Sequence, residues 1–425
     1  MGADSFPLDT DVSPTHIPSF SFPQASVSNM IHLSRKRGVV VSRVNRGVEI
    51  WRLGAASSSD QASAAPVDSI LPLESEPTKL ALMPGRKGTK DYYTCAAINP
   101  NASLLCLSDH SATNLFSLTL PDTKSIDADS ANAETPPLHI AKIQLPGAVL
   151  SPDLLFCDFC HHLNDELMVA VTAAGRLESI RYQVANPAQL PLQKAALHLS
   201  QDGLPTCFAL RTRTRQEKAD LPLAVIGFSS GRVDVVDLVN VRVLTSLPVL
   251  RGIGVSAVAI CPDGAEIAAL YVNREIAFFQ LDSQKTEYWP KLDDVPGAAW
   301  RGAGKPLLPI QKAVYLSSTK LLMHSDRRIH VLDRVAPVNP TSLTTPLNAS
   351  HDDDDSDLED AEAKRPRLVG DTPSPPSFTF KTLPSFDVVH FVDVMDNGEL
   401  VVAETTTEKV EESMPEPLLK KKYGT

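Results

Sequence analysis

The residues best suited to chemistry lie in one short stretch, Cys157-Asp-Phe-Cys160-His161. This Cys-x-x-Cys-His spacing is that of covalent haem attachment, and it can also begin a zinc site. Haem attachment requires export, but the N-terminus MGADSFPLDTDVSP has neither a basic region nor an apolar run. Structural zinc needs four ligands, and the nearest other cysteines, Cys106 and Cys207, are about fifty residues away. We therefore expect no metal and no cofactor.

The same stretch has a simpler interpretation as a buried β-strand. In a strand, successive side chains point to opposite faces of the sheet. Phe156, Asp158 and Cys160 would then lie on one face, and Cys157 and Phe159 on the other. The rival hypothesis is a metal-binding or enzymatic protein that uses Cys157, Cys160 and His161, and metal analysis of the purified protein would distinguish the two.

No other part of the chain offers a catalytic arrangement. There is no nucleophile elbow, no glycine-rich phosphate loop and no metalloprotease helix motif. The pairs Asp263-Gly264 and Asn397-Gly398 are typical of turns. Because no general acid and base can be assembled, we predict no catalytic residues and a protein that is not an enzyme.

Composition indicates a globular protein rich in short elements. Of its 425 residues, 43% are apolar and 21% are charged, and the 34 prolines cluster between apolar runs. The net charge is −11, but eight acids lie between His351 and Glu362, so the remainder is nearly neutral. Proteins that bind nucleic acid through its phosphates usually carry a basic excess. We therefore expect contact with RNA to be indirect.

The sequence shows no membrane-spanning, secretory or myristoylation signal. No apolar run approaches the roughly 18 residues needed to cross a bilayer. The N-terminus is not a secretory signal, and Phe6 stands where a myristoylation signal has serine or threonine. We expect an intracellular, soluble protein without membrane association, whose six cysteines are reduced.

One six-residue pattern recurs along the chain: apolar, any, apolar, apolar, any, apolar. A recurring unit is the first sign of a repeat architecture. The copies, the last two weaker, are Val48–Leu53, Leu177–Tyr182, Val233–Leu238, Ile276–Leu281, Thr113–Leu118 and Ile329–Arg334. Their anchor residues are Trp51, Ile180, Val236, Phe279, Phe116 and Leu332.

Each copy follows another apolar run after a short turn such as Asn-Arg-Gly or Ser-Gly-Arg, which is typical of a β-hairpin. Before the hairpins lie further apolar runs, at Cys95–Ile98, Leu154–Phe159, Cys207–Leu210, Val255–Ile260 and Ala313–Leu316. Units of three to four antiparallel strands are blades of a β-propeller. A pair of β-sandwiches is the alternative. The pattern predicts an all-β, seven-bladed WD40-like β-propeller, although the chain has no Trp-Asp dipeptide.

The predicted organisation has five parts. Residues 1–25 are an N-terminal segment in which Ile17–Phe22 is a candidate strand for closing the ring, since closure removes an exposed edge. Residues 26–336 form blades 1–6, residues 337–385 a disordered acidic and basic insertion, residues 386–404 the last blade, and residues 405–425 a C-terminal tail.

The insertion carries two candidate signals. The cluster Lys364, Arg365, Pro366 and Arg367 is either a nuclear-import patch or a solvated charge run. Ser356, which is followed by acids, is either an acid-directed phosphorylation site or an ordinary residue of a solvated segment.

Two stretches resemble the cirhin family, also called U3 small nucleolar RNA-associated protein 4. The first is Val48-Glu-Ile-Trp-Arg-Leu-Gly54, which resembles a blade-closing segment of that family. The second is Leu400-Val-Val-Ala-Glu404 followed by a Pro-containing spacer and the end Lys420-Lys-Lys-Tyr-Gly-Thr425. One departure is Thr405-Thr-Thr-Glu, which replaces the basic-proline continuation of the family. Family members resemble two propellers in tandem, and this chain corresponds to the second.

The resemblance implies a nucleolar scaffold subunit of the small-subunit processome. Such a subunit supports transcription of pre-ribosomal RNA and maturation of the small-subunit RNA through contacts with other propeller and helical subunits. The alternative is a WD40-like adaptor in another nuclear or cytoplasmic complex. We expect the tail to dock into a neighbouring subunit, with Tyr423 as its anchor. The predicted partner-binding residues are Leu418, Leu419, Lys420, Lys421, Lys422, Tyr423, Gly424 and Thr425.

Overall fold

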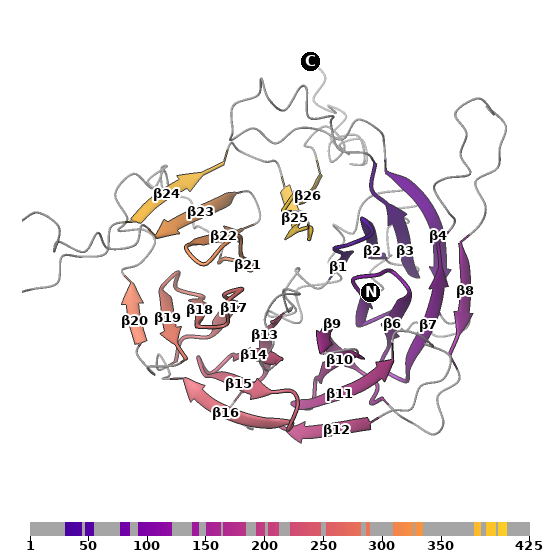
Figure 1. Ribbon diagram of the computed structural model, residues 1–425, viewed down its shortest axis with the longest axis horizontal. Coiled ribbons are helices and arrows are strands. Elements are labelled where there is room, and N and C mark those ends of the chain that lie inside the picture. The colour runs from indigo at the N-terminus through magenta and orange to yellow at the C-terminus, as the bar shows by residue number, and fades with distance from the viewer. Residues whose placement is uncertain are drawn as a thin grey trace, which may run out of the picture.

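The computed structural model describes residues 30–44, 47–54, 77–85, 92–120, 138–143, 150–162, 165–183, 193–199, 203–211, 222–247, 252–281, 286–289, 309–325, 328–334, 378–383, 388–396 and 398–405. These residues form an all-β fold without a helix. They build seven antiparallel sheets, six of four strands and one of two. The described part contains no helix that could span a membrane. Figure 1 shows the sheets side by side around a common centre, which is a propeller-like arrangement.

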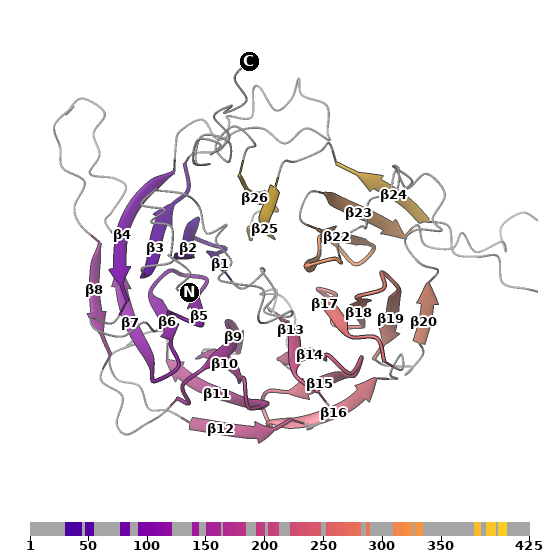
Figure 2. The ribbon, with the colours of Figure 1, turned by 180° about the vertical axis from the view of Figure 1, so that it is seen from behind.

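The first strand of each sheet lies nearest the centre of the ring, as both views show (Figures 1 and 2). These inner strands are β1 (Ile31–Ser34), β5 (Cys95–Ile98), β9 (Leu154–His162), β13 (Pro205–Leu210), β17 (Val255–Ile260), β21 (Lys312–Tyr315) and β25 (Val388–Val394). Each pairs with a second strand: β2 (Val39–Val44), β6 (Leu104–Ser108), β10 (Asp165–Thr172), β14 (Leu223–Phe228), β18 (Glu266–Tyr271), β22 (Lys320–His324) or β26 (Leu400–Thr405).

The six recurring segments all occupy the third position of their sheets. They form β3 (Gly47–Arg52), β7 (Thr113–Thr119), β11 (Arg176–Gln183), β15 (Val233–Asp237), β19 (Ile276–Gln280) and β23 (Ile329–Arg334). The fourth, outermost strands are β4 (Thr78–Pro84), β8 (His139–Lys142), β12 (Gln193–His198), β16 (Arg242–Leu247), β20 (Thr286–Trp289) and β24 (Phe378–Thr382). Sequence repetition therefore corresponds to equivalent structural positions.

Seven apolar clusters hold the ring together, one between each pair of neighbouring sheets. Alternate side chains of a strand point to opposite faces, so each sheet contributes to two clusters. Ile180 packs toward the preceding sheet, and Val236, Phe279 and Leu332 do the same in their sheets. The cluster between the last sheet and the first is the smallest, with three buried residues: Ile31, Leu33 and Phe391. The junction between the last and first sheets is therefore the one with the fewest buried apolar residues.

One predicted boundary was wrong. The insertion expected at 337–385 ends earlier, because Phe378–Thr382 is the fourth strand of the sheet that contains β23. Its Phe378 and Phe380 pair with Arg334 and Leu332. The Thr- and Pro-rich residues before this strand hid its short apolar alternation. Residues 337–377 and the candidate strand Ile17–Phe22 lie outside the described residues.

Candidate functional site

The ring has two faces, which differ in their exposed side chains. We call the face on which the inner strands begin the start face; it also carries the turns between second and third strands. Three large apolar side chains more than half exposed lie there: Tyr92 (56%) before β5, Leu204 (60%) before β13, and Val272 (51%) after β18. Leu316, on the opposite face, is 39% exposed. Tyrosine is a residue type enriched among the anchors of protein interfaces, whereas leucine and valine exposed singly are ordinary surface residues.

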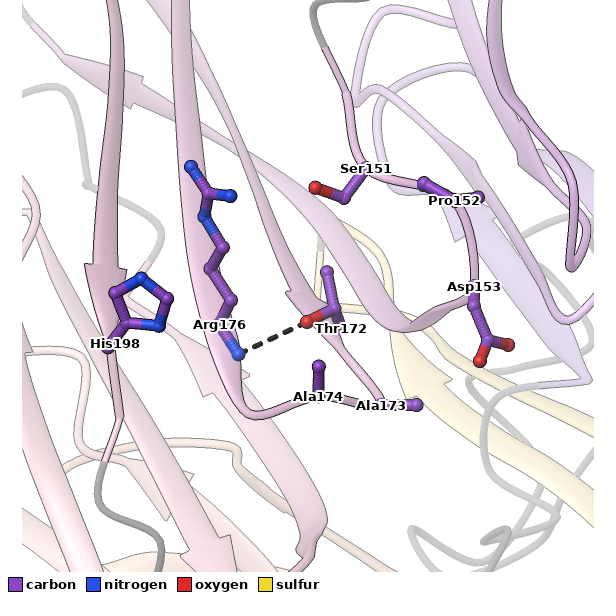
Figure 3. A pocket seen from close by; sticks show the side chains of 8 residues that line it. All are labelled: Ser151, Pro152, Asp153, Thr172, Ala173, Ala174, Arg176 and His198. Atoms are coloured by element: carbon purple, nitrogen blue, oxygen red, sulfur yellow. Dashed lines mark hydrogen bonds between the residues drawn. The ribbon is translucent and has the colours of Figure 1, made fainter.

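The start face also contains a depression of about 330 Å³ between the turn of β10–β11 and the loop before β9. Figure 3 shows its lining side chains, among them Ser151, Thr172, Arg176 and His198. Asp153, on its rim, pairs with His110 at 2.9 Å. The depression combines mainly apolar walls with a guanidinium and an imidazole.

The buried carboxylate of Glu178 holds several of the residues around this depression in place. It accepts hydrogen bonds from the Ser151 backbone N–H (3.0 Å) and hydroxyl (2.6 Å). Arg176 and Lys194 each lie 3.4 Å from it. Burial would raise the pKa of Glu178, but the bonds from Ser151 and the two cations outweigh burial and lower it. Glu178 thus fixes the loop before β9 and both cations in one charge-paired arrangement beneath the depression.

A second polar cluster lies among the inner strands and joins three sheets. Asp393 on β25 binds Arg35, after β1, at 3.1 Å and Lys312 on β21 at 2.8 Å. Burial would raise the pKa of Asp393, but the charges of Arg35 and Lys312 hold it well below its usual value. The carboxylate also raises the pKa of Arg35. We call Arg35, Lys312 and Asp393 the closing cluster, because it bridges the first and last sheets.

A second polar pair, His32 and Asp158, also joins two inner strands. His32 Nε2 lies 3.2 Å from Asp158 on β9, and the Ile98 N–H donates to His32 Nδ1 at 3.3 Å. The proton of this imidazole is therefore placed on Nε2, toward the carboxylate. In the closing cluster and in the His32–Asp158 pair, the charged side chains contact partners of opposite or complementary charge. Both arrangements are therefore suited to holding neighbouring sheets together rather than to binding an ion.

The Cys-x-x-Cys stretch forms a strand, as the alternation predicted. Cys157 and Phe159 lie in the apolar cluster toward the preceding sheet, and Phe156 and Cys160 in the cluster toward the next sheet. A hydrogen bond with the neighbouring Cys106 thiol, together with burial, raises the pKa of the Cys157 thiol. The two thiols point in opposite directions and cannot share one metal. No group of three His, Cys, Asp or Glu side chains suited to a metal occurs in the described part.

The other predicted site residues are not brought together by the described structure. The tail Leu418–Thr425 and the cluster Lys364–Arg367 lie outside the described residues, and so does Ser356. The closing cluster was not predicted from the sequence. Its one local signal is Asp393 within the apolar strand Val388-Val-His-Phe-Val-Asp-Val394, since a buried acid needs a partner.

Comparisons with known proteins gave one distant structural similarity to report and no sequence relative. No family model matches the chain, and no curated protein matches it. A chain from a solved structure described as "Crystal Structure of Mitotic Checkpoint Complex" matches with 11% identity and a TM-score of 0.49. The match covers 90% of this chain and 85% of that chain. Similarity at this level carries no inference about function.

Proposed function

We propose that this chain is a seven-bladed, WD40-like β-propeller that acts as a non-catalytic scaffold subunit of the small-subunit processome in the nucleolus. In this proposal the two-stranded sheet is the last blade. Residues 1–25 supply a closing strand, the insertion carries the nuclear-import patch Lys364–Arg367, and residues 405–425 form a docking tail. The partners are other propeller and helical subunits, and the chain supports pre-ribosomal RNA transcription and small-subunit RNA maturation without direct RNA contact.

The observation that carries the scaffold role is the equivalence of the six recurring strands. All six hold the third position of their sheets, so the chain devotes its repeated sequence to building a rigid ring. The polar clusters of the inner strands are charge-paired, and the described thiols are buried. Function on such a fold resides in its surfaces. The nucleolar assignment rests on the resemblance of Val48–Gly54 and of the C-terminal end to the cirhin family.

Affinity purification of the tagged full chain, with identification of its partners, tests the proposal. We expect processome subunits to be recovered. Deleting residues 418–425 should reduce their recovery, as should Tyr423→Ala, because the tail would lose its aromatic anchor. Thr407→Ala in the same tail is the matched control and should change nothing. Recovery of a different complex would contradict the assignment to the processome. Unchanged recovery after the deletion would contradict the role of the tail.

Localisation tests the import patch separately. Replacing Lys364, Arg365 and Arg367 with alanine should shift the protein toward the cytoplasm, whereas replacing three acids of His351–Glu362 should not. If both variants remain nuclear, the basic cluster is not an import signal.

A further inference from the structure

A histidine is buried where the sixth sheet, β21 to β24, meets the last sheet, β25 and β26. Leu322 of β22 shares an apolar cluster with Val389 and Val392 of β25. Because side chains two positions apart in a strand lie on the same face, His324 of β22 also faces the last sheet. His324 is 0% exposed. The junction between the two sheets therefore contains an imidazole that water does not reach.

The surroundings of this imidazole favour its neutral form. His324 Nδ1 lies 3.1 Å from the carbonyl oxygen of Ser325, which can only accept a hydrogen bond, so the proton is on Nδ1. His324 Nε2 is buried and has no hydrogen-bond partner among the described residues. A second proton on Nε2 would therefore place an unpaired charge inside the junction. Burial accordingly lowers the pKa of His324 to about 4.

The titratable groups next to His324 add to this effect. Lys312 of β21 is its direct neighbour, because the two residues are paired in register. His390 of β25 is 8% exposed, and a charge on it would repel a charge on His324. Asp393 attracts a charged imidazole, but it already binds Arg35 and Lys312. Among the described residues, the other charged groups of the adjoining elements at this end of the junction are Arg328, Lys381 and Glu404.

The described residues give this junction few buried apolar side chains. Its cluster has five: Leu322, Ile329, Leu383, Val389 and Val392. The cluster between the last and first sheets has three, whereas each of the other five clusters has ten or more. The free energy of burial grows with the apolar area removed from water. Separating the sixth sheet from the last therefore costs less than separating the sheets on the far side of the ring.

We propose that mild acid opens the ring at the junction between the sixth and last sheets, while the sheets on the far side stay folded. In the open ring, His324 and His390 contact water and accept protons. Their charges then oppose closure, because closing would bury them beside Lys312. At neutral pH both imidazoles are uncharged and the junction stays closed. This property concerns the ring itself and does not depend on which partners the scaffold binds.

The size of the effect follows from the protonation of His324. In the open ring its pKa returns to about 6.5, whereas in the closed ring it is about 4. Because the closed form has the lower pKa, the open form takes up the proton first as the pH falls, and stability of the closed form is lost below about pH 6.5. Between pH 7 and pH 5, the ratio of open to closed rings should rise roughly 20-fold through this residue.

Hydrogen exchange of the full chain, followed by mass spectrometry, measures the opening. Exchange rates are divided by the intrinsic rate at each pH, so that the protection factor reports the fraction of open rings. We expect the protection factors of amides in β25 and β26 to fall roughly 20-fold or more between pH 7 and pH 5. Amides of β10 and β14, across the ring (Figure 1), should remain at least tenfold better protected at pH 5.

Histidine variants make the test specific. His324→Asn should remove most of the pH dependence in β25 and β26, because asparagine keeps a donor for the Ser325 carbonyl but does not titrate. His390→Asn should reduce it too, and it serves as the second variant if the first does not fold. His330→Asn is the matched control, since His330 is also 0% exposed but lies two positions from Leu332, on the face toward the fifth sheet. It should leave the pH dependence of β25 and β26 unchanged.

Two results would overturn the proposal. If β25 and β26 lose protection only together with β10 and β14, the ring unfolds as a whole and does not open at one junction. If His324→Asn and His390→Asn both keep the pH dependence of the parent, these imidazoles do not control the opening. Both outcomes leave the scaffold role intact, because that role is judged by co-purification of processome subunits at neutral pH.

Discussion

Replacing Asp393 with asparagine should destabilise the protein by about 2–4 kcal/mol. The carboxylate is 7% exposed and lies 3.1 Å from Arg35 and 2.8 Å from Lys312, which are 26% and 23% exposed. Removing one partner of a buried ion pair costs about 3–5 kcal/mol, because the remaining charge stays buried. Here two cations remain, but water reaches about a quarter of each, and we lower the expected loss for this screening.

Unfolding in guanidinium chloride, followed by circular dichroism, measures this loss. Asp396→Asn, in the adjoining exposed turn, removes a weaker and more exposed charge that also acts on Arg35, and should change the free energy of unfolding by less than about 0.5 kcal/mol. Combining Asp393→Asn with Arg35→Gln should cost less than the sum of the two single changes, by more than about 1 kcal/mol. A loss below about 0.5 kcal/mol for Asp393→Asn, or simple additivity, would refute a closing role for this cluster.

Four further outcomes follow from the structure. Burial lowers the pKa of His324 to about 4, so the unfolded state takes up this proton at a higher pH than the folded state does. As the pH falls from 7 to 4, the parent protein should therefore lose about 3 kcal/mol of stability through this residue. The His324→Asn variant should not show this loss. Phe391→Ala should cost about 3–5 kcal/mol in chemical unfolding, because it empties the small cluster at the junction of the last and first sheets. All six thiols are buried, and burial raises the pKa of Cys95 to about 12, so a thiol reagent should label none of them in the native protein and six after denaturation. Tyr92→Asp on the start face should reduce recovery of partners at least tenfold in quantitative purification, whereas Leu316→Asp on the opposite face should not.

Sequence patterns predicted the inner and third strands well, and for a physical reason. Segments such as Cys95–Ile98 and Ile276–Gln280 are buried on both faces along nearly their whole length, so nearly every side chain is apolar and the pattern is strong. The outermost strands were not located. In β16 exposed and half-buried residues alternate from Arg242 onward, and such short polar alternation is not distinguishable from a loop.

The closing cluster could not be predicted for a different reason. Arg35 and Asp393 are 358 positions apart, and only closure of the ring brings them together. An acid within an apolar strand indicates that a partner exists, but it does not say which cation fills the role.

Cutting the chain tests most directly whether the ring closes on itself. A protease site placed within residues 337–377 would separate a fragment carrying β24, β25 and β26 from the rest of the protein. That fragment should remain bound through the pairing of β24 with β23 and the packing of β25 between β21 and β1. Both pieces should co-elute in native size-exclusion chromatography, and Asp393→Arg should release the fragment. Separation of the two pieces of the parent protein under native conditions would contradict the account.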